Sequence, residues 1–302
     1  DNDVDPEVPE GTEYYLPAGS SYRVTPFSLM KGFRLAGSRD GVKPVVVLEG
    51  SWSIAEGSYL SSLEFDNIEF RHEANNNYFM NTSKAYTIEN VSFVNCDFIS
   101  LRRGFWRHQS ANAKYIMNLE MEGCRFEGCG WQTSAYGTFN LQSFDKDNGV
   151  SYDQVDRAIF RNCTFSNDND GTNGYGWGNL FYAPYMDKPI ELEYKNVTIY
   201  NYSRNQRLIN IESAVGSKLV MQGILLASPC GDLYAIGANT TTTFSDNYTT
   251  ADYALGGSKM NATDLEITAD KLFADPVNGD LTIKDTSSPI VSSRAGDTRW
   301  LP

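Results

Sequence analysis

The chain has few of the residues that build metal centres and disulfide frameworks. Its 302 residues include 2 histidines and 5 cysteines, an odd number. The cysteines form neither a CxxC pair nor a Cys/His spacing typical of zinc sites. The composition therefore argues against a zinc centre and against a domain held by disulfides.

The chain is also short of positive charge and of long apolar runs. Lys and Arg number 25 against 38 Asp and Glu, which gives a formal net charge of −13. Nucleic-acid-binding proteins present a basic face, so no nucleic acid partner is expected. Polyanionic ligands would need bridging cations. Because no run of about 18 apolar residues occurs, no transmembrane segment is expected either.

What the chain does have is a short motif in six copies, each reading apolar, variable, Asn or Gly, apolar, variable, apolar. The copies are FDNIEF from Phe65, FVNCDF from Phe93, MEGCRF from Met121, FRNCTF from Phe160, YKNVTI from Tyr194 and MQGILL from Met221. Self-similarity at a fixed period of about 20–50 residues is typical of stacked supersecondary units. The repeat therefore predicts a solenoid.

Each motif describes two short strands that meet at a bend. Apolar residues two apart mark a strand with one buried face. The residue between the halves is Asn or Gly, which tolerates a left-handed backbone and lets the chain turn sharply. These positions are Asn67, Asn95, Gly123, Asn162, Asn196 and Gly223.

A third strand is expected in each coil, after a loop. The candidate segments begin at Tyr78, Gly104, Gly137, Asn179, Arg207 and Asp232. The pattern predicts an all-β fold, a single-stranded right-handed parallel β-helix with three short strands per coil. A leucine-rich repeat would need Leu at fixed positions, and a propeller would need four strands per unit.

Three cysteines share one position of the motif. Cys96, Cys124 and Cys163 occupy a column that holds Ile or Val in the other coils. Free Cys packs as a small hydrophobe, so we expect a buried apolar ladder rather than a metal or nucleophile site. Cys129 and Cys230 fall outside this column.

The third strands carry the residues best suited to bind a glycan. Aromatic rings stack on sugars, amides bind hydroxyls, and Arg can hold a carboxylate with two hydrogen bonds. The candidate glycan-binding residues are Trp106, Asn140, Gln142, Tyr182, Tyr185, Asn210 and Glu212. Alternation places Asn140 and Gln142 outward and leaves open which of Arg107 and His108 joins them. If the protein were a lyase, Arg107, His108 or Arg207 would transfer the proton.

Paired carboxylates, which glycoside hydrolases need about 5–9.5 Å apart, occur on the first strands as Glu64/Asp66 and Glu120/Glu122. The two pairs lie two coils apart, and the coil between them offers Ser92 and Val94. We therefore expect a solvated face of mixed charge there, without an acidic cluster.

A polar loop gathers oxygen ligands of the kind that Ca²⁺ prefers, at Asp168, Asp170 and Asn173. It matches only part of a calcium loop, because Trp177 takes the place of the final acidic ligand. The alternative is an adaptable aromatic loop that overhangs a groove. Ca²⁺ is the one cofactor that the sequence suggests.

The chain is expected to form one continuous solenoid domain. Residues 1–13, acidic and Pro-containing, are interpreted as a linker remnant left after removal of an upstream segment. Residues 14–58 are assigned to the initial coils, 59–240 to the central β-helix repeats, and 241–302 to C-terminal coils and a cap.

Two stretches outside the repeats resemble parts of known proteins. The segment from Tyr14 to Phe70, with its GFRLAG and KPVV steps, and the segment LFADPVNGDLTIKD…AGDTRW from Leu272 to Trp300 resemble the secreted and surface-anchored pectate-lyase-like β-helix proteins of Bacteroidetes. Most members of that group have no characterised function. The resemblance implies a role in polysaccharide capture or degradation, and export with a lipid anchor to the cell surface.

Three functions remain open at this point. The first is an exported protein that binds a polysaccharide or oligosaccharide in a glycan-utilisation system, with outer-membrane glycan-uptake proteins as partners and no clear catalytic constellation of its own. The second is a polysaccharide lyase or glycoside hydrolase acting on an acidic, pectin-like glycan. The third is a structural or adhesive solenoid.

Overall fold

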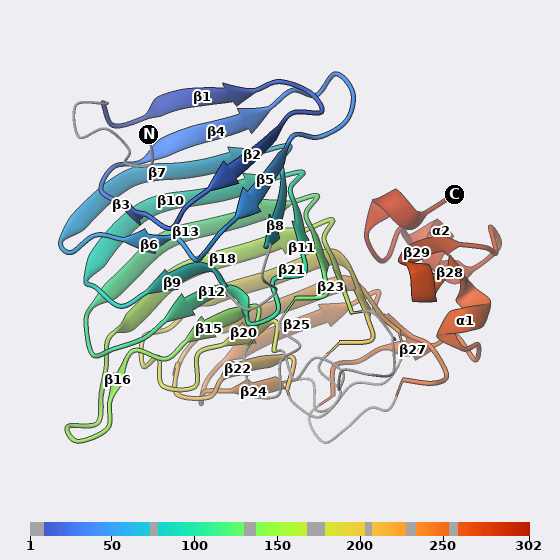
Figure 1. Ribbon diagram of the computed structural model, residues 1–302. Helices are drawn as coiled ribbons and strands as arrows, with labels where there is room; N and C mark the ends of the chain where they lie inside the picture. Colours follow the sequence, from blue (N-terminus) through green and yellow to red (C-terminus); the bar gives the residue numbers. More distant parts are fainter. Residues whose placement is uncertain are drawn as a thin grey trace.

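A computed structural model describes residues 9–72, 78–129, 137–167, 179–202, 207–227, 234–253 and 259–302. The chain winds as a stack of coils, and strands of successive coils pair in parallel along the stack (Figure 1). The predicted all-β parallel β-helix is confirmed. No helix among the described residues combines the length and hydropathy that crossing a bilayer requires.

The first strands of the coils form the longest wall, here called the first sheet. Its strands are β1 (Thr12–Leu16), β4 (Phe33–Gly37), β7 (Ser58–Asp66), β10 (Tyr86–Val94), β13 (Lys114–Glu122), β18 (Asp153–Arg161), β21 (Glu191–Tyr200), β23 (Lys218–Ala227) and β25 (Thr241–Ser245). The motif copies pair in register: Phe93 lies opposite Phe65 on one side and Met121 on the other. The sequence repeat is thus the structural repeat.

The second sheet begins after the bend and continues the first as one 17-stranded sheet. It contains the last residues of β21 and β23 together with β2 (Ser21–Val24), β5 (Val45–Leu48), β8 (Glu69–His72), β11 (Asp97–Ile99), β14 (Arg125–Glu127), β19 (Thr164–Ser166), β26 (Tyr248–Thr249) and β27 (Thr263–Asp264). All six predicted bend residues have positive φ, between 49° at Asn162 and 65° at Gly123.

The third sheet contains all six predicted third strands. They are β9 (Tyr78–Thr82), β12 (Gly104–His108), β15 (Phe139–Leu141), β20 (Phe181–Tyr182), β22 (Ile209–Ile211) and β24 (Tyr234–Ile236). The short β3 (Ser28–Leu29) and β6 (Ser53–Ile54) pair with each other in the coils before β9. A hairpin of β16 (Phe144–Asp145) and β17 (Val150–Ser151) projects after β15 (Figure 1).

Stacked rings and aliphatic side chains fill the space between the sheets. Phe65 stacks on Phe93 at 4.8 Å between ring centroids, and Phe160 stacks on Tyr194 at 4.5 Å. The cysteine column is buried as predicted: Cys96, Cys124 and Cys163 are free thiols with no exposed surface. Burial raises the pKa of Cys96 and Cys163, so neither supplies a thiolate at neutral pH. Cys230 lies outside the described residues.

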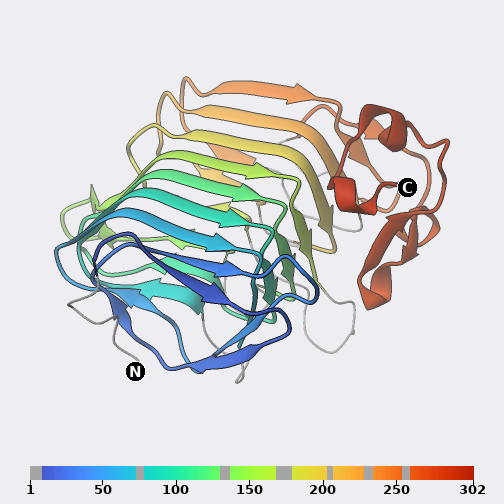
Figure 2. The same ribbon diagram turned by 90° about the horizontal axis from the view of Figure 1, so that it is seen from above.

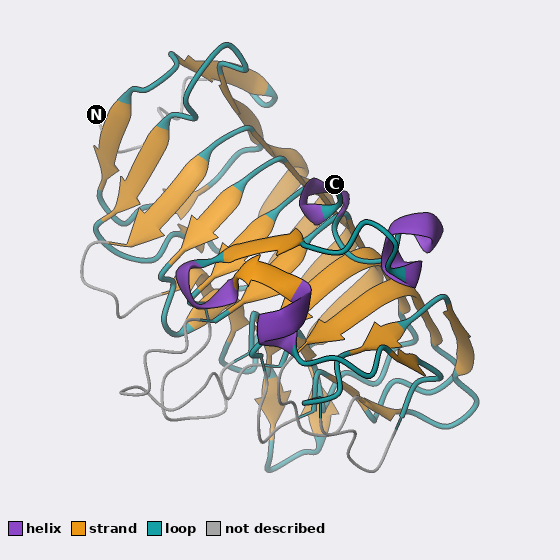
Figure 3. Cartoon of the chain, turned by 90° about the vertical axis from the view of Figure 1, so that its right-hand side faces the viewer, coloured by secondary structure: helices purple, strands orange, loops and turns teal. Residues whose placement is uncertain are grey.

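The C-terminal residues 269–302, here called the flank module, pack on the side of the stack. The module contains α1 (Ala269–Leu272), β28 (Phe273–Asp275), the 3₁₀ turn η1 (Pro276–Asn278), β29 (Asp280–Ile283), α2 (Pro289–Ser293) and η2 (Thr298–Trp300). Figures 2 and 3 show it beside the coils, over the second sheet. It shares a small apolar core with Tyr200, Leu225 and Ala227 of that sheet.

Polar contacts fix the flank module to the middle coils. The Asp297 carboxylate accepts a hydrogen bond from Thr164 Oγ1 at 2.7 Å, and the Asp297 amide donates to Thr198 Oγ1 at 2.9 Å. Trp300 Nε1 donates to Thr164 Oγ1 at 2.7 Å, and the Gly296 amide donates to the Gly223 carbonyl at 2.8 Å. The segment that was assigned to a cap therefore covers a flank.

The N-terminal boundary also differs from the expected one. β1 starts at Thr12, inside the segment interpreted as a linker. Glu10 is tied to two coils, because its carboxylate accepts from the Gly32 amide at 2.7 Å and from the Ser61 amide at 2.9 Å. These hydrogen bonds and the start of β1 at Thr12 make residues 10–13 part of the solenoid.

Candidate functional site

The third sheet presents one continuous row of outward residues, which we call the outer row. Arg107 of β12 lies opposite Asn140 of β15, Asn140 opposite Tyr182 of β20, and Tyr182 opposite Asn210 of β22. Because the strands pair in parallel, the row runs along the axis of the stack. The structure thereby answers the open question about β12: Arg107 is half-buried at the outer face, and His108 points inward.

Trp106 is not a sugar-stacking platform, contrary to the sequence prediction. Its side chain is 0% exposed. The amides of Phe105 and Trp106 both donate to the Thr138 carbonyl, at 2.8 and 2.9 Å. This shared acceptor breaks the simple alternation at the start of β12, so both aromatic rings enter the core.

His108 is also excluded as a group that touches a surface ligand. It is 0% exposed and lies between Asp153, with Oδ1 at 2.7 Å from Nδ1, and Tyr86, with the hydroxyl at 2.6 Å from Nε2. The carboxylate can only accept, so Nδ1 carries the proton and Nε2 accepts from Tyr86. Burial lowers the pKa of His108, against the opposing effect of Asp153.

The same interior network contains a lysine. Lys114 is 1% exposed, and its ammonium donates to the carbonyls of Asn112 at 2.7 Å and Ser110 at 3.2 Å. Burial lowers the pKa of Lys114 to about 8. Trp106 Nε1 donates to the Tyr86 hydroxyl at 3.3 Å. The network is an internal scaffold that pins the third sheet to the first.

The amides of the outer row are buried, and the oxygen of each accepts a hydrogen bond from a neighbour, while Asn140 Nδ2 has no partner among the described contacts. Asn140 is 0% exposed, and its Oδ1 accepts from Gln142 Nε2. Asn210 is 6% exposed, and its Oδ1 accepts from the Glu212 amide at 3.2 Å. The prediction that Asn140 and Asn210 offer exposed amides is therefore wrong. Their side chains point outward but are covered.

Six of the candidate residues remain accessible at the third sheet: Arg107, Gln142, Tyr182, Tyr185, Arg207 and Glu212. Arg207 and Glu212 form an exposed ion pair at 3.2 Å. Burial raises the pKa of Tyr182; Tyr185 and Glu212 raise it further, and Arg207 acts in the opposite direction.

Two ring contacts give this surface fixed aromatic geometry. Tyr185 stacks on Phe144 of the β16–β17 hairpin, with centroids 4.3 Å apart and planes at 15°. The Arg107 guanidinium carbon lies 5.6 Å from the centre of the Tyr78 ring, within the range of a cation–π contact. The surface thus combines the rings of Tyr182 and Tyr185 with the Arg107 guanidinium, whose position the Tyr78 ring helps to fix.

The outer face of the first sheet is a mixed-charge face, as predicted. Ser92 separates Glu64 from Glu120 in the register. Glu120 pairs with Arg157 at 2.7 Å, and Asp66 pairs with Arg34 at 3.0 Å. Carboxylates held by arginines in this way do not form the paired acids of a hydrolase.

The calcium candidates Asp168, Asp170 and Asn173 lie outside the described residues. Within the parts of the chain that the structure describes, no group of three or more His, Cys, Asp or Glu side chains could hold a metal ion.

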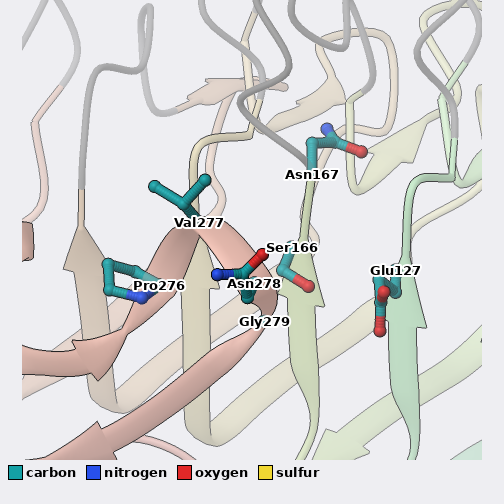
Figure 4. Close-up of a pocket in the computed structure, with 7 residues that line it drawn as sticks. All are labelled: Glu127, Ser166, Asn167, Pro276, Val277, Asn278 and Gly279. Atoms are coloured by element: carbon teal, nitrogen blue, oxygen red, sulfur yellow. The ribbon is translucent and has the colours of Figure 1, made fainter.

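The flank module creates two hollows that the sequence did not indicate. One, of about 440 Å³, lies at the bends and is lined by Asn95, Glu122, Gly123, Asn162, Asp297, Thr298 and Arg299. The other, of about 350 Å³, lies where η1 faces β14 and β19 (Figure 4). Both require contact between segments more than a hundred residues apart, so no local pattern could have revealed them.

No protein-family model matches the chain, and no curated protein matches it in sequence. The solenoid architecture and the accessible surface of the third sheet are therefore the basis for a functional assignment.

Proposed function

We propose that this protein binds a polysaccharide along the outer face of its third sheet and does not cleave it. The observation that carries the proposal is the accessible set of Tyr182 and Tyr185 on one coil and Arg107 two coils away along the stack. A linear polymer lying along the stack would meet these side chains in succession. Rings offer faces for sugars, and a cation offers a partner for a uronate carboxylate.

The absence of a catalytic arrangement at the described surface supports binding over cleavage. His108 is buried, and Asp66 and Glu120 of the first sheet are paired with arginines. A general acid or base must come within hydrogen-bonding reach of its substrate. The proposal also includes export and capture at the cell surface, beside outer-membrane glycan-uptake proteins, and this part rests on the resemblance of the terminal segments alone.

Native electrophoresis through gels cast with pectin or with a neutral glucan, with and without Ca²⁺, tests the proposal. We expect one polymer to retard the protein. The double variant Tyr182→Ala/Tyr185→Ala should lose about tenfold in affinity, equivalent to about 1.4 kcal/mol. Tyr59→Ala is the matched control, because Tyr59 is 56% exposed on the first sheet.

Staining the gels for remaining polymer separates the alternatives. Retardation over intact polymer, reduced only in the double variant, supports the proposal. Equal retardation of both variants would place binding elsewhere. A cleared track would instead indicate a lyase or hydrolase, and Arg107→Ala and Arg207→Ala would then be the variants to assay. No retardation by any polymer would leave a structural or adhesive solenoid.

A further inference from the structure

The cleft between the flank module and the second sheet has a defined wall on each side. On one side the η1 turn, Pro276–Asn278, is followed by Gly279 with φ 84°. On the other side lie Glu127 of β14 and Ser166 of β19. Figure 4 shows the η1 turn with Asn278 in front of the strand that carries Ser166, with Asn167 at the end of that strand and Glu127 on the neighbouring strand. Its volume of about 350 Å³ falls within the range of small-molecule sites, roughly 300–1,000 Å³.

An unpaired amide lines this cleft. Asn167 directly follows β19 and is 4% exposed. Among the described contacts, neither Oδ1 nor Nδ2 of Asn167 has a hydrogen-bond partner. A buried amide that lacks partners is costly and calls for an explanation. An incoming group that both donates and accepts would satisfy both atoms, and a hydroxyl is the simplest such group.

The remaining lining indicates that the ligand is uncharged. The carboxylate of Glu127 already pairs with Arg125 at 3.2 Å. Ser166 and Asn278 contribute a hydroxyl and an amide, while Pro276 and Val277 contribute apolar surface. A single carboxylate does not make a cation site, and among the described residues that line the cleft none is a cation that could hold an anion. Hydrogen-bond donors and acceptors beside apolar surface match a sugar ring, which carries several hydroxyl groups on an apolar frame.

We propose that this cleft is a second ligand site, which takes one neutral sugar residue. Asn167 and Ser166 hydrogen-bond its hydroxyl groups, and η1 covers one face of its ring. The site is on the second sheet and does not share residues with the surface of the third sheet. It can therefore be occupied whether or not a polysaccharide binds there.

Saturation-transfer NMR with methyl glycosides of glucose, galactose and mannose tests this site, with methyl galacturonoside as the charged comparison. We expect saturable transfer to at least one neutral glycoside and weaker transfer to the uronoside. Asn167→Ala should weaken the affinity about tenfold or more. Because the amide has no hydrogen-bond partner among the residues that the structure describes, the melting temperature should not fall.

Two further variants keep the test decisive. Asn179→Ala is the matched control: Asn179 is 1% exposed, its amide atoms also have no partner among the described contacts, and it does not line the cleft. Val277→Trp fills the cleft from a position that is 58% exposed and should abolish transfer in a folded protein. Absence of transfer from every neutral glycoside, or equal transfer in wild type, Asn167→Ala and Val277→Trp, would overturn the proposal.

Discussion

At the scale of single residues, the interior network around His108 shows how a polar group can serve the fold alone. The imidazole connects Tyr86 of the first sheet to Asp153 two coils further on, and Asp153 also accepts from the Ser143 amide at 2.6 Å. Both ring nitrogens are thereby satisfied at a position with no exposed surface. His108, a catalytic candidate in the sequence, therefore has a structural role and links the third sheet to the first.

The lowered pKa of His108 makes a prediction about acid stability. In the unfolded chain the pKa of His108 is about 6.5, and in the folded protein its pKa is lower. Below about pH 6.5 the unfolded state binds a proton that the folded state refuses, so the free energy of unfolding falls as the pH drops. We expect urea denaturation to show lower stability at about pH 5.5 than at about pH 7.

The variant His108→Gln isolates this contribution. It should be less stable than wild type at about pH 7, by about 2 kcal/mol, because the network loses its partners. Its stability should change less between the two pH values. His72 is present in both proteins and cancels in the comparison. Equal pH dependence in the two proteins would show that His108 does not titrate on unfolding.

At the scale of elements, the bends explain why the architecture could be predicted from the sequence. A left-handed residue is needed once per coil at a fixed place, and Asn or Gly supplies it with little strain. The strands on both sides then keep one register, as the pairing of Phe65, Phe93 and Met121 shows. Because the motif recurs, the same bend and the same strand register are predicted independently in each of its six copies.

The orientation of the third strands could not be predicted with the same success. These strands are two to five residues long, which leaves too few positions for alternation to define a face. At β12 the shared acceptor of Phe105 and Trp106 removes even that signal. Asn140 shows a second difficulty, because an outward side chain can still be covered by its neighbours. The sequence identified the strands, but the exposure expected for Trp106, Asn140 and Asn210 was wrong.

The bend at Asn95 separates backbone strain from hydrogen bonding. Asn95 has φ 51°, and its Nδ2 donates to Asn67 Oδ1 at 2.6 Å. Asn95→Gly keeps the backbone freedom and loses the bond, so we expect a cost of about 1 kcal/mol. Asn95→Ala loses the bond and adds left-handed strain, for a total of about 2–3 kcal/mol. Chemical denaturation measures both, and equal costs would mean that strain at the bend is negligible.

At the scale of the whole molecule, the flank module adds contacts that a simple solenoid does not have. Repeats in a stack contact only their neighbours, so stability is close to a sum of local terms. Here Asp297 and Trp300 both bond to Thr164, while Gly296 bonds to Gly223. One segment therefore joins coils that are not adjacent in the stack.

This bridging predicts a local response to loss of the Asp297 carboxylate. Asp297 is 2% exposed and also pairs with Arg299 at 2.8 Å. In Asp297→Ala we expect hydrogen exchange to increase in residues 269–302 and in β19, while β12 and β15 keep their protection. Asp270→Ala is the control, because its side chain is 67% exposed. Unchanged exchange in the module would show that the apolar core alone holds it.

The attachment of the flank module also sets the path of mechanical load. A force applied at Pro302 does not first peel the last coil from the stack, because residues 296–300 are bonded to β19 and to the bends at Gly123 and Gly223. Tension enters at the middle of the solenoid and is shared among several strands at once. A solenoid built this way would resist sequential unfolding that starts from its C-terminal coil.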